Sequence, residues 1–97
     1  MHKKQSSLTQ EININSCLES LNDKDLNQAL LTCNEVIKKF PNKIEPLAER
    51  SLIYTLNGQN HLACLDIKNA LKIMKGQDTD PLTKYQIRIR HDSCKKR

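Results

Sequence analysis

Apolar residues recur along this chain at a spacing that itself repeats after 34 residues, and this double periodicity most constrains the fold. Within each segment the apolar positions fall three and four residues apart, which is the period of one face of an α-helix. Repetition at about 34 residues is typical of stacked helical hairpins, in which each hairpin buries apolar surface against the next. The residue pairs that keep this offset are Ala29 and Ala63, Cys33 and Ile67, Val36 and Ala70, and Ile37 and Leu71.

Helix-breaking residues separate the apolar stripes of the first two predicted helices. The first helix is expected to begin with a capping box formed by Ser7 and Gln10. Its apolar stripe is Ile14, Cys17, Leu18 and Leu21. The second helix carries the regular stripe from Leu26 to Phe40 and is expected to end before Pro41, because proline lacks the amide hydrogen that would continue the helix.

Three more helices are predicted after Pro41. Pro46 suits the first turn of a third helix, which Asn57-Gly58 should close, since glycine adopts a left-handed cap without penalty. A fourth helix is expected from Asn60 to Gly76. Asp80-Pro81 places a hydrogen-bond acceptor just before a fifth helix that runs into a basic end.

The repeated segments resemble the second helix of the tetratricopeptide repeat (TPR). In residues 25–36 and 59–70, small and large apolar residues alternate as they do in that family. Pro41, Gly58 and Tyr54 match its closing proline, its turn glycine and the aromatic residue of its first helix. Residues 66–71 and the fifth helix also faintly resemble the helical repeats of SET-and-MYND-domain methyltransferases, without any residue of their catalytic domain.

The resemblance implies an all-α fold, a right-handed superhelix of antiparallel helix pairs with about five helices. Residues 1–9 would form a flexible N-terminus, residues 10–76 two TPR-like hairpins, and residues 77–97 a basic capping helix or part of a third repeat. Arrays of this kind usually need at least three repeats. The chain is therefore either a minimal module or the edge of a longer array.

The resemblance also implies a binding surface, because TPR proteins hold peptides in a groove formed by the first helix of each repeat. In the second repeat this groove would present Glu45, Ala48, Glu49, Leu52, Thr55 and Leu56. The alternative is that Leu52 and Leu56 belong to the core and the glutamates to a solvated face. Glu49 stands where chaperone-binding members carry an asparagine, and its carboxylate would repel an acidic chaperone tail. A neutral or basic peptide is expected instead.

The net charge of +5 belongs entirely to the end of the chain, since residues 1–83 hold ten basic and ten acidic residues. The basic residues beyond them are Lys84, Arg88, Arg90, Lys95, Lys96 and Arg97. They could form a solvated capping helix, a nuclear-import signal or patch for an acidic partner, or a contact to RNA phosphates. Nucleic acid ranks last, because the chain has only three aromatic residues for base stacking.

The four cysteines form no C-x-x-C motif, and no histidine lies at zinc-ligand spacing from any of them. Cys17, Cys33 and Cys64 are expected to act as small buried apolar residues, and Cys94 to be exposed. The chain shows no signal-peptide pattern and no membrane-spanning apolar run. We therefore expect a cytoplasmic or nuclear protein with reduced thiols.

No combination of nucleophile, base and orienting group suggests catalysis, and no motif suggests a cofactor or a metal. The sequence predicts a non-catalytic module that binds another protein.

Overall fold

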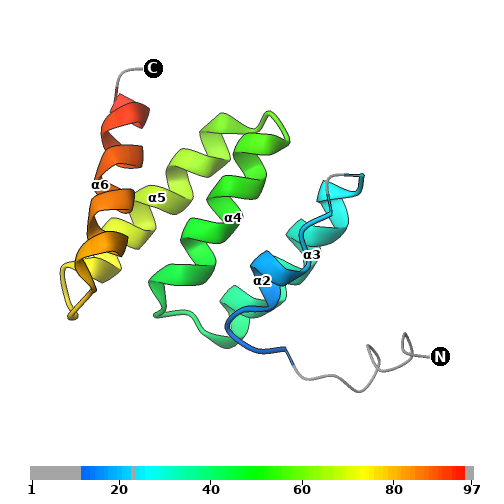
Figure 1. Ribbon diagram of the computed structural model, residues 1–97, viewed down its shortest axis with the longest axis horizontal. Helices are drawn as coiled ribbons and strands as arrows, with labels where there is room; N and C mark the ends of the chain where they lie inside the picture. The colour runs from blue at the N-terminus through cyan, green and yellow to red at the C-terminus, as the bar shows by residue number, and fades with distance from the viewer. Residues whose placement is uncertain (1–11, 23, 96–97) are drawn as a thin grey trace.

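The computed structural model describes residues 12–22 and 24–95. Every regular element of this part of the chain is an α-helix, as predicted (Figure 1). The helices are α2 (Ser16–Glu19), α3 (Leu26–Lys39), α4 (Ile44–Leu56), α5 (Asn60–Met74) and α6 (Pro81–Lys95). The predicted capping box of Ser7 and Gln10 lies outside the described residues, as do Lys96 and Arg97 of the basic end.

Helix α2 is a single turn and much shorter than the predicted first helix. Polar side chains before and after it bond to the backbone and compete with helical hydrogen bonding. The Asn15 amide donates to Asn13 Oδ1 at 2.8 Å, and the Ser20 hydroxyl donates to the Cys17 carbonyl at 2.7 Å. Of the predicted stripe, only Cys17 is fully buried, whereas Leu18 is exposed.

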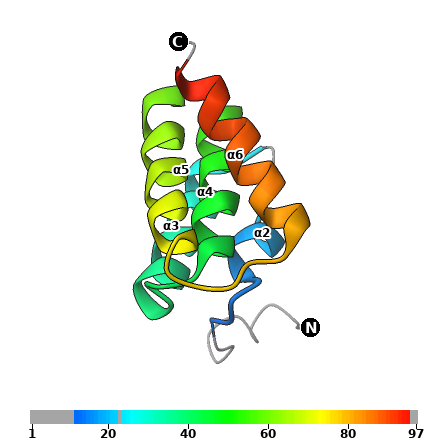
Figure 2. The same cartoon turned by 90° about the vertical axis from the view of Figure 1, so that its left-hand side faces the viewer.

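Consecutive helices pack against each other, and α2 touches both α3 and α4. Viewed along the end of the stack, α3 and α5 lie on one side of the molecule and α2 and α6 on the other (Figure 2). The most extensive packing is between α4 and α5, which form the central hairpin. Short connections produce this order. A loop of a few residues cannot carry the chain far from the end of one helix, so the next helix packs antiparallel against it.

Two clusters of buried side chains form the core. The first joins α2, α3 and α4, and the second joins α4, α5 and α6. Positions 34 residues apart are buried alike: Ala29 and Ala63 are both buried, and so are Cys33 and Ile67. Small residues at 29 and 63 let neighbouring helices approach closely. Helix α6 contributes one fully buried side chain, that of Ile87.

Aspartates cap two of the helices. The Gln28 amide donates to Asp25 Oδ1 at 3.0 Å, and the Thr83 amide donates to Asp80 Oδ2 at 3.0 Å. The predicted cap at Asp80 is thus confirmed, and hydrogen bonds from the side chain and the amide of Thr83 hold the pKa of Asp80 below its ordinary value. Helix α3 ends at Lys39, two residues before Pro41, as expected.

The turn between α4 and α5 depends on Gly58, whose φ is 77°. We expect Gly58→Ala to lower the free energy of unfolding by about 1 kcal/mol, because a side chain disfavours the left-handed conformation. A Cβ at this position would meet no atom within 4 Å, so the loss is purely conformational.

Gly76→Ala is the matched control for urea-unfolding measurements. A Cβ at position 76 would lie 3.7 Å from the Ile73 carbonyl oxygen, an ordinary contact, and Gly76 has no positive φ. It should therefore leave the stability nearly unchanged. Equal losses in the two variants would contradict the role given to the Gly58 conformation.

Candidate functional site

Helix α4 exposes four of the six residues that the sequence assigned to a binding groove. Leu52 is 41% exposed and Leu56 is 56% exposed. Glu45 and Thr55 are exposed as well, while Ala48 and Glu49 are half-buried. The opposite side of α4 supplies Leu47 and Ile53 to the core. The alternative that Leu52 and Leu56 are core residues is therefore wrong.

Exposed apolar side chains also lie on α2 and α6. We call the whole set the apolar face; its members are Leu18 on α2, Leu52 and Leu56 on α4, and Leu82, Tyr85 and Ile89 on α6. A cleft of about 180 Å³ borders it, and Leu52, Thr55, Ile67, Arg90 and Ser93 are among its lining residues. Four further exposed leucines lie elsewhere: Leu21 follows α2, and Leu31, Leu62 and Leu65 lie on α3 and α5.

Glu49 brings a negative charge into partly buried surroundings between α4 and α2. Its Oε1 atom is buried, and no side chain or backbone group of the described residues donates a hydrogen bond to it. Burial raises the pKa of Glu49, a hydrogen bond with the Leu18 backbone partly offsets this, and the charges of Glu45 and Glu19 raise it further. The apolar face thus carries an acidic border whose charge is poorly compensated.

Replacement of Glu49 by glutamine should stabilise the protein near neutral pH. The folded state binds the Glu49 proton more tightly than the unfolded state does, so its contribution to stability is present at low pH and lost as pH rises through the folded-state pKa. Urea unfolding across pH 4–7 should show the variant to be more stable at the upper end, by less than about 1 kcal/mol because water still screens the side chain. A constant difference at all pH values would contradict this.

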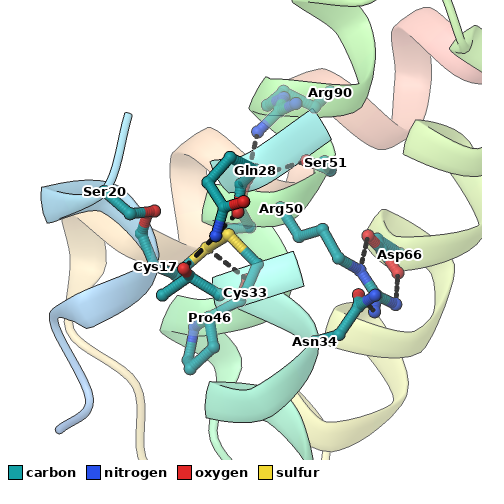
Figure 3. The surroundings of a disulfide bond; sticks show 12 residues. Cys17, Ser20, Gln28, Cys33, Asn34, Pro46, Arg50, Ser51, Asp66 and Arg90 are labelled. Carbon is teal, nitrogen blue, oxygen red and sulfur yellow. Dashed lines mark hydrogen bonds and ion pairs between the residues drawn. A yellow bond between two sulfur atoms is a disulfide. The ribbon is translucent and has the colours of Figure 1, made fainter. Parts of the chain in front are cut away.

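An ion pair and its hydrogen bonds tie α3, α4 and α5 together (Figure 3). Arg50 on α4 donates from Nε to Asp66 Oδ2 at 2.8 Å and from Nη2 to Asp66 Oδ1 at 2.6 Å. Its Nη1 donates to Asn34 Oδ1 on α3 at 2.8 Å. Asp66 on α5 is only 3% exposed. No local sequence pattern indicates this network, because the two charges are 16 residues apart and look like ordinary surface residues.

The residues of the predicted basic patch do not all lie on one exposed surface. Lys84, Arg88 and Lys95 are exposed on α6. Arg90 instead turns inward and donates from Nη1 to the Ala48 carbonyl at 3.1 Å. Burial lowers the pKa of Arg90, which is offset in part by the negative charge of Asp66. Arg90 is thus a packing contact between α6 and α4 and not part of an exposed basic surface.

The expectation of four reduced thiols is wrong, because the cysteines form two disulfides. Cys17 pairs with Cys33, which joins α2 to α3, and Cys64 pairs with Cys94, which joins α5 to α6. Cys94 is half-buried and not exposed as predicted. Helix packing brings together residues that sequence spacing cannot pair, since four cysteines allow three connectivities.

Two other features of the described residues bear on the kind of site present. No helix among them is long and apolar enough to cross a membrane. Among the same residues, no group of three histidine, cysteine, aspartate or glutamate side chains is placed to hold a metal ion.

Fold and surface together define an all-α chain of sequentially packed helices with an exposed apolar face and an acidic border. No family model matches the chain, and neither a curated protein nor a solved structure matches it.

Proposed function

We propose that this chain is a non-catalytic module of the TPR type that binds a peptide or helix of a partner protein along its apolar face. The observation that carries the proposal is the exposure of Leu52 and Leu56 on the helix where that family forms its groove. Exposed apolar surface contributed by several large side chains commonly marks an interaction site. An amphipathic segment could cover it with side chains spaced three and four residues apart.

Three observations support the TPR assignment itself. Burial repeats with the 34-residue offset, consecutive helices pack on each other, and α2 also touches α4, the corresponding helix of the next hairpin. In a TPR superhelix, the first helices of successive hairpins line one surface. The apolar face lies on α2, α4 and α6, which are the first helices of successive hairpins under this assignment.

The acidic border favours a neutral or basic partner. Glu49 is partly desolvated and has Glu45 and Glu19 near it, so a lysine or arginine of the partner would supply the missing opposite charge. An acidic chaperone tail would add to the repulsion instead. We propose a segment with apolar residues on one side and at least one basic residue beside them.

A peptide-display selection followed by fluorescence anisotropy tests the proposal. Leu56→Glu should weaken binding of a selected peptide by about tenfold or more, because a charge would enter an apolar contact and one leucine side chain would lose its burial. Leu31→Glu is the matched control, since Leu31 is 58% exposed on α3, outside the apolar face, and Leu56 is 56% exposed. Equal losses in both variants, or none in either, would exclude the apolar face as the binding surface.

Glu49→Lys tests the chemistry of the partner in the same assay. We expect it to weaken basic peptides and to favour acidic ones, because the border would change sign. If the wild type and Glu49→Lys bind basic and acidic peptides with the same affinities, the charge at Glu49 does not select the partner. If the selection returns only helical segments that resemble a TPR hairpin, the apolar face is the edge of a longer array.

A second candidate function is electrostatic binding of an acidic protein surface or RNA by α6. It is favoured by the exposure of Lys84, Arg88 and Lys95 on this helix. Binding of this kind weakens steeply with salt. A flat salt response, or no loss when residues 84–97 are removed, would exclude it.

The two disulfides also bear on the compartment. Disulfides persist in oxidising environments and are rare in the cytosol. We therefore propose an oxidising compartment in place of the cytoplasmic or nuclear location expected from the sequence.

A further inference from the structure

The two disulfides differ in their access to solvent. Cys17 and Cys33 are both 0% exposed and sit in the first core cluster. Cys64 and Cys94 are half-buried and line two open clefts. One cleft, of about 190 Å³, is bordered by His61, Leu65, Lys68, His91 and Lys95. The other, of about 180 Å³, lies between this disulfide and Leu52 of the apolar face. A small molecule can therefore reach the second disulfide from solvent, but not the first.

The charges around the Cys64–Cys94 cleft favour the approach of an anionic reactant. Its lining contains the ammonium groups of Lys68 and Lys95 and no carboxylate. The species that attacks a disulfide is a thiolate anion, and the group that leaves is another thiolate. Neighbouring lysines stabilise both anions, and positively charged, partly exposed surroundings are typical of reactive sulfur.

This disulfide ties the C-terminal end of helix α6 to α5. Helix α6 buries one side chain completely, that of Ile87, and makes one hydrogen bond to α4, from Arg90 to the Ala48 carbonyl. The disulfide is the covalent link between α6 and α5, and it closes a 30-residue separation in the chain. Once it opens, only non-covalent packing against α5, the burial of Ile87 and the Arg90 hydrogen bond hold α6 in place.

We propose that Cys64–Cys94 is a site of thiol–disulfide exchange with small anionic thiols, and that its reduction releases α6. A thiolate attacks one sulfur of the pair, so that a mixed disulfide forms and the Sγ–Sγ bond breaks. The displaced cysteine leaves as a thiolate and takes a proton from water. A second thiolate then attacks the mixed disulfide, which frees the other cysteine and yields the oxidised dimer of the small thiol. Two electrons pass from the two small thiols to the protein.

Differential alkylation tests the first half of the proposal. The folded protein is incubated with reduced glutathione, quenched with iodoacetamide at set times and digested with trypsin for mass spectrometry. The four cysteines fall in separate tryptic peptides, since Lys24, Arg50 and Lys68 are among the residues that separate them. We expect Cys64 and Cys94 to be alkylated at least about tenfold faster than Cys17 and Cys33. Equal rates, or faster labelling of Cys17 and Cys33, would overturn the proposal.

The role of the lysines is tested by comparing two thiols of different charge. Mercaptoethanesulfonate carries an extra negative charge, and cysteamine carries a positive one. The wild type should react faster with the former, after correction for the rate of each thiol with a small model disulfide. Lys68→Glu/Lys95→Glu should remove or invert this preference, by about threefold or more. An unchanged preference would overturn the assignment of these lysines.

Amide hydrogen exchange tests the release of α6. After selective reduction, exchange in residues 81–95 should rise about tenfold or more while exchange in α4 and the first half of α5 changes little. Cys64→Ser/Cys94→Ser should reproduce this pattern without any reductant, and Cys17→Ala/Cys33→Ala should not. Unchanged exchange in α6, either after selective reduction or in Cys64→Ser/Cys94→Ser, would overturn the proposed release.

Discussion

Replacement of Asp66 by alanine is expected to lower the free energy of unfolding by about 3 kcal/mol. The carboxylate is buried and accepts two hydrogen bonds from Arg50, at 2.6 and 2.8 Å. Its removal leaves the largely buried guanidinium of Arg50 without an opposite charge, and Arg90 loses a favourable electrostatic interaction as well. Urea unfolding monitored by circular dichroism measures the loss.

A variant that replaces both partners separates the lost interaction from the uncompensated charge. Arg50→Met/Asp66→Leu removes both partners and replaces them with apolar side chains, so it should be clearly more stable than Asp66→Ala alone. Asp92→Ala serves as a control at an exposed position of α6 and should change stability by less than about 0.5 kcal/mol. If Asp66→Ala costs no more than Asp92→Ala, the ion pair does not stabilise the fold.

Removal of the Cys17–Cys33 disulfide is expected to lower the free energy of unfolding by about 3 kcal/mol. The two cysteines are 16 residues apart, and the link restricts the unfolded chain over that separation. Alanine is the suitable replacement, because both positions are fully buried and a serine hydroxyl would enter an apolar cluster. The comparison is made between the oxidised wild type and Cys17→Ala/Cys33→Ala in urea.

Loss of the Cys17–Cys33 disulfide should also change unfolding in a different way from loss of the Cys64–Cys94 disulfide. Cys17 and Cys33 pack in the same cluster as Ile53 of the central hairpin, so their loss should destabilise the cooperative unit as a whole. Cys64→Ser/Cys94→Ser should instead loosen α6 before the main transition, since α6 buries only Ile87 completely. A loss below about 1 kcal/mol for the Cys17 and Cys33 variant would contradict a structural role for that disulfide.

The sequence predicted the central helices well because their signals are local. Pro41, Gly58 and Asp80 all mark helix ends close to where the structure places them. Their effects come from the backbone of the same or neighbouring residues, so no knowledge of distant contacts is needed. The first helix was predicted too long, because hydrogen bonds of Asn13 and Ser20 to the nearby backbone compete with a weak apolar stripe.

The candidate site was predicted in part. Four of the six α4 residues named as a possible binding surface are exposed, but the sequence left open whether Leu52 and Leu56 were buried. That depends on which side of α4 meets α3 and α5. Arg90 was placed on a basic surface because its charge is visible in the sequence, whereas its contact to the Ala48 carbonyl is not. Neither the network of Arg50 nor the disulfide pairing has a local signal.

The periodic apolar pattern by itself determined that the chain forms consecutive helices, and the 34-residue offset determined which positions are buried alike. Both follow from the geometry of a single helix and of short connections, which act over a few residues. The tertiary structure decided which side chains of α4 stay exposed, which cysteines pair, and where the buried charge of Asp66 finds its partner. These outcomes depend on how the helices approach one another, because burial and opposite charge are properties of contacts between residues far apart in the chain.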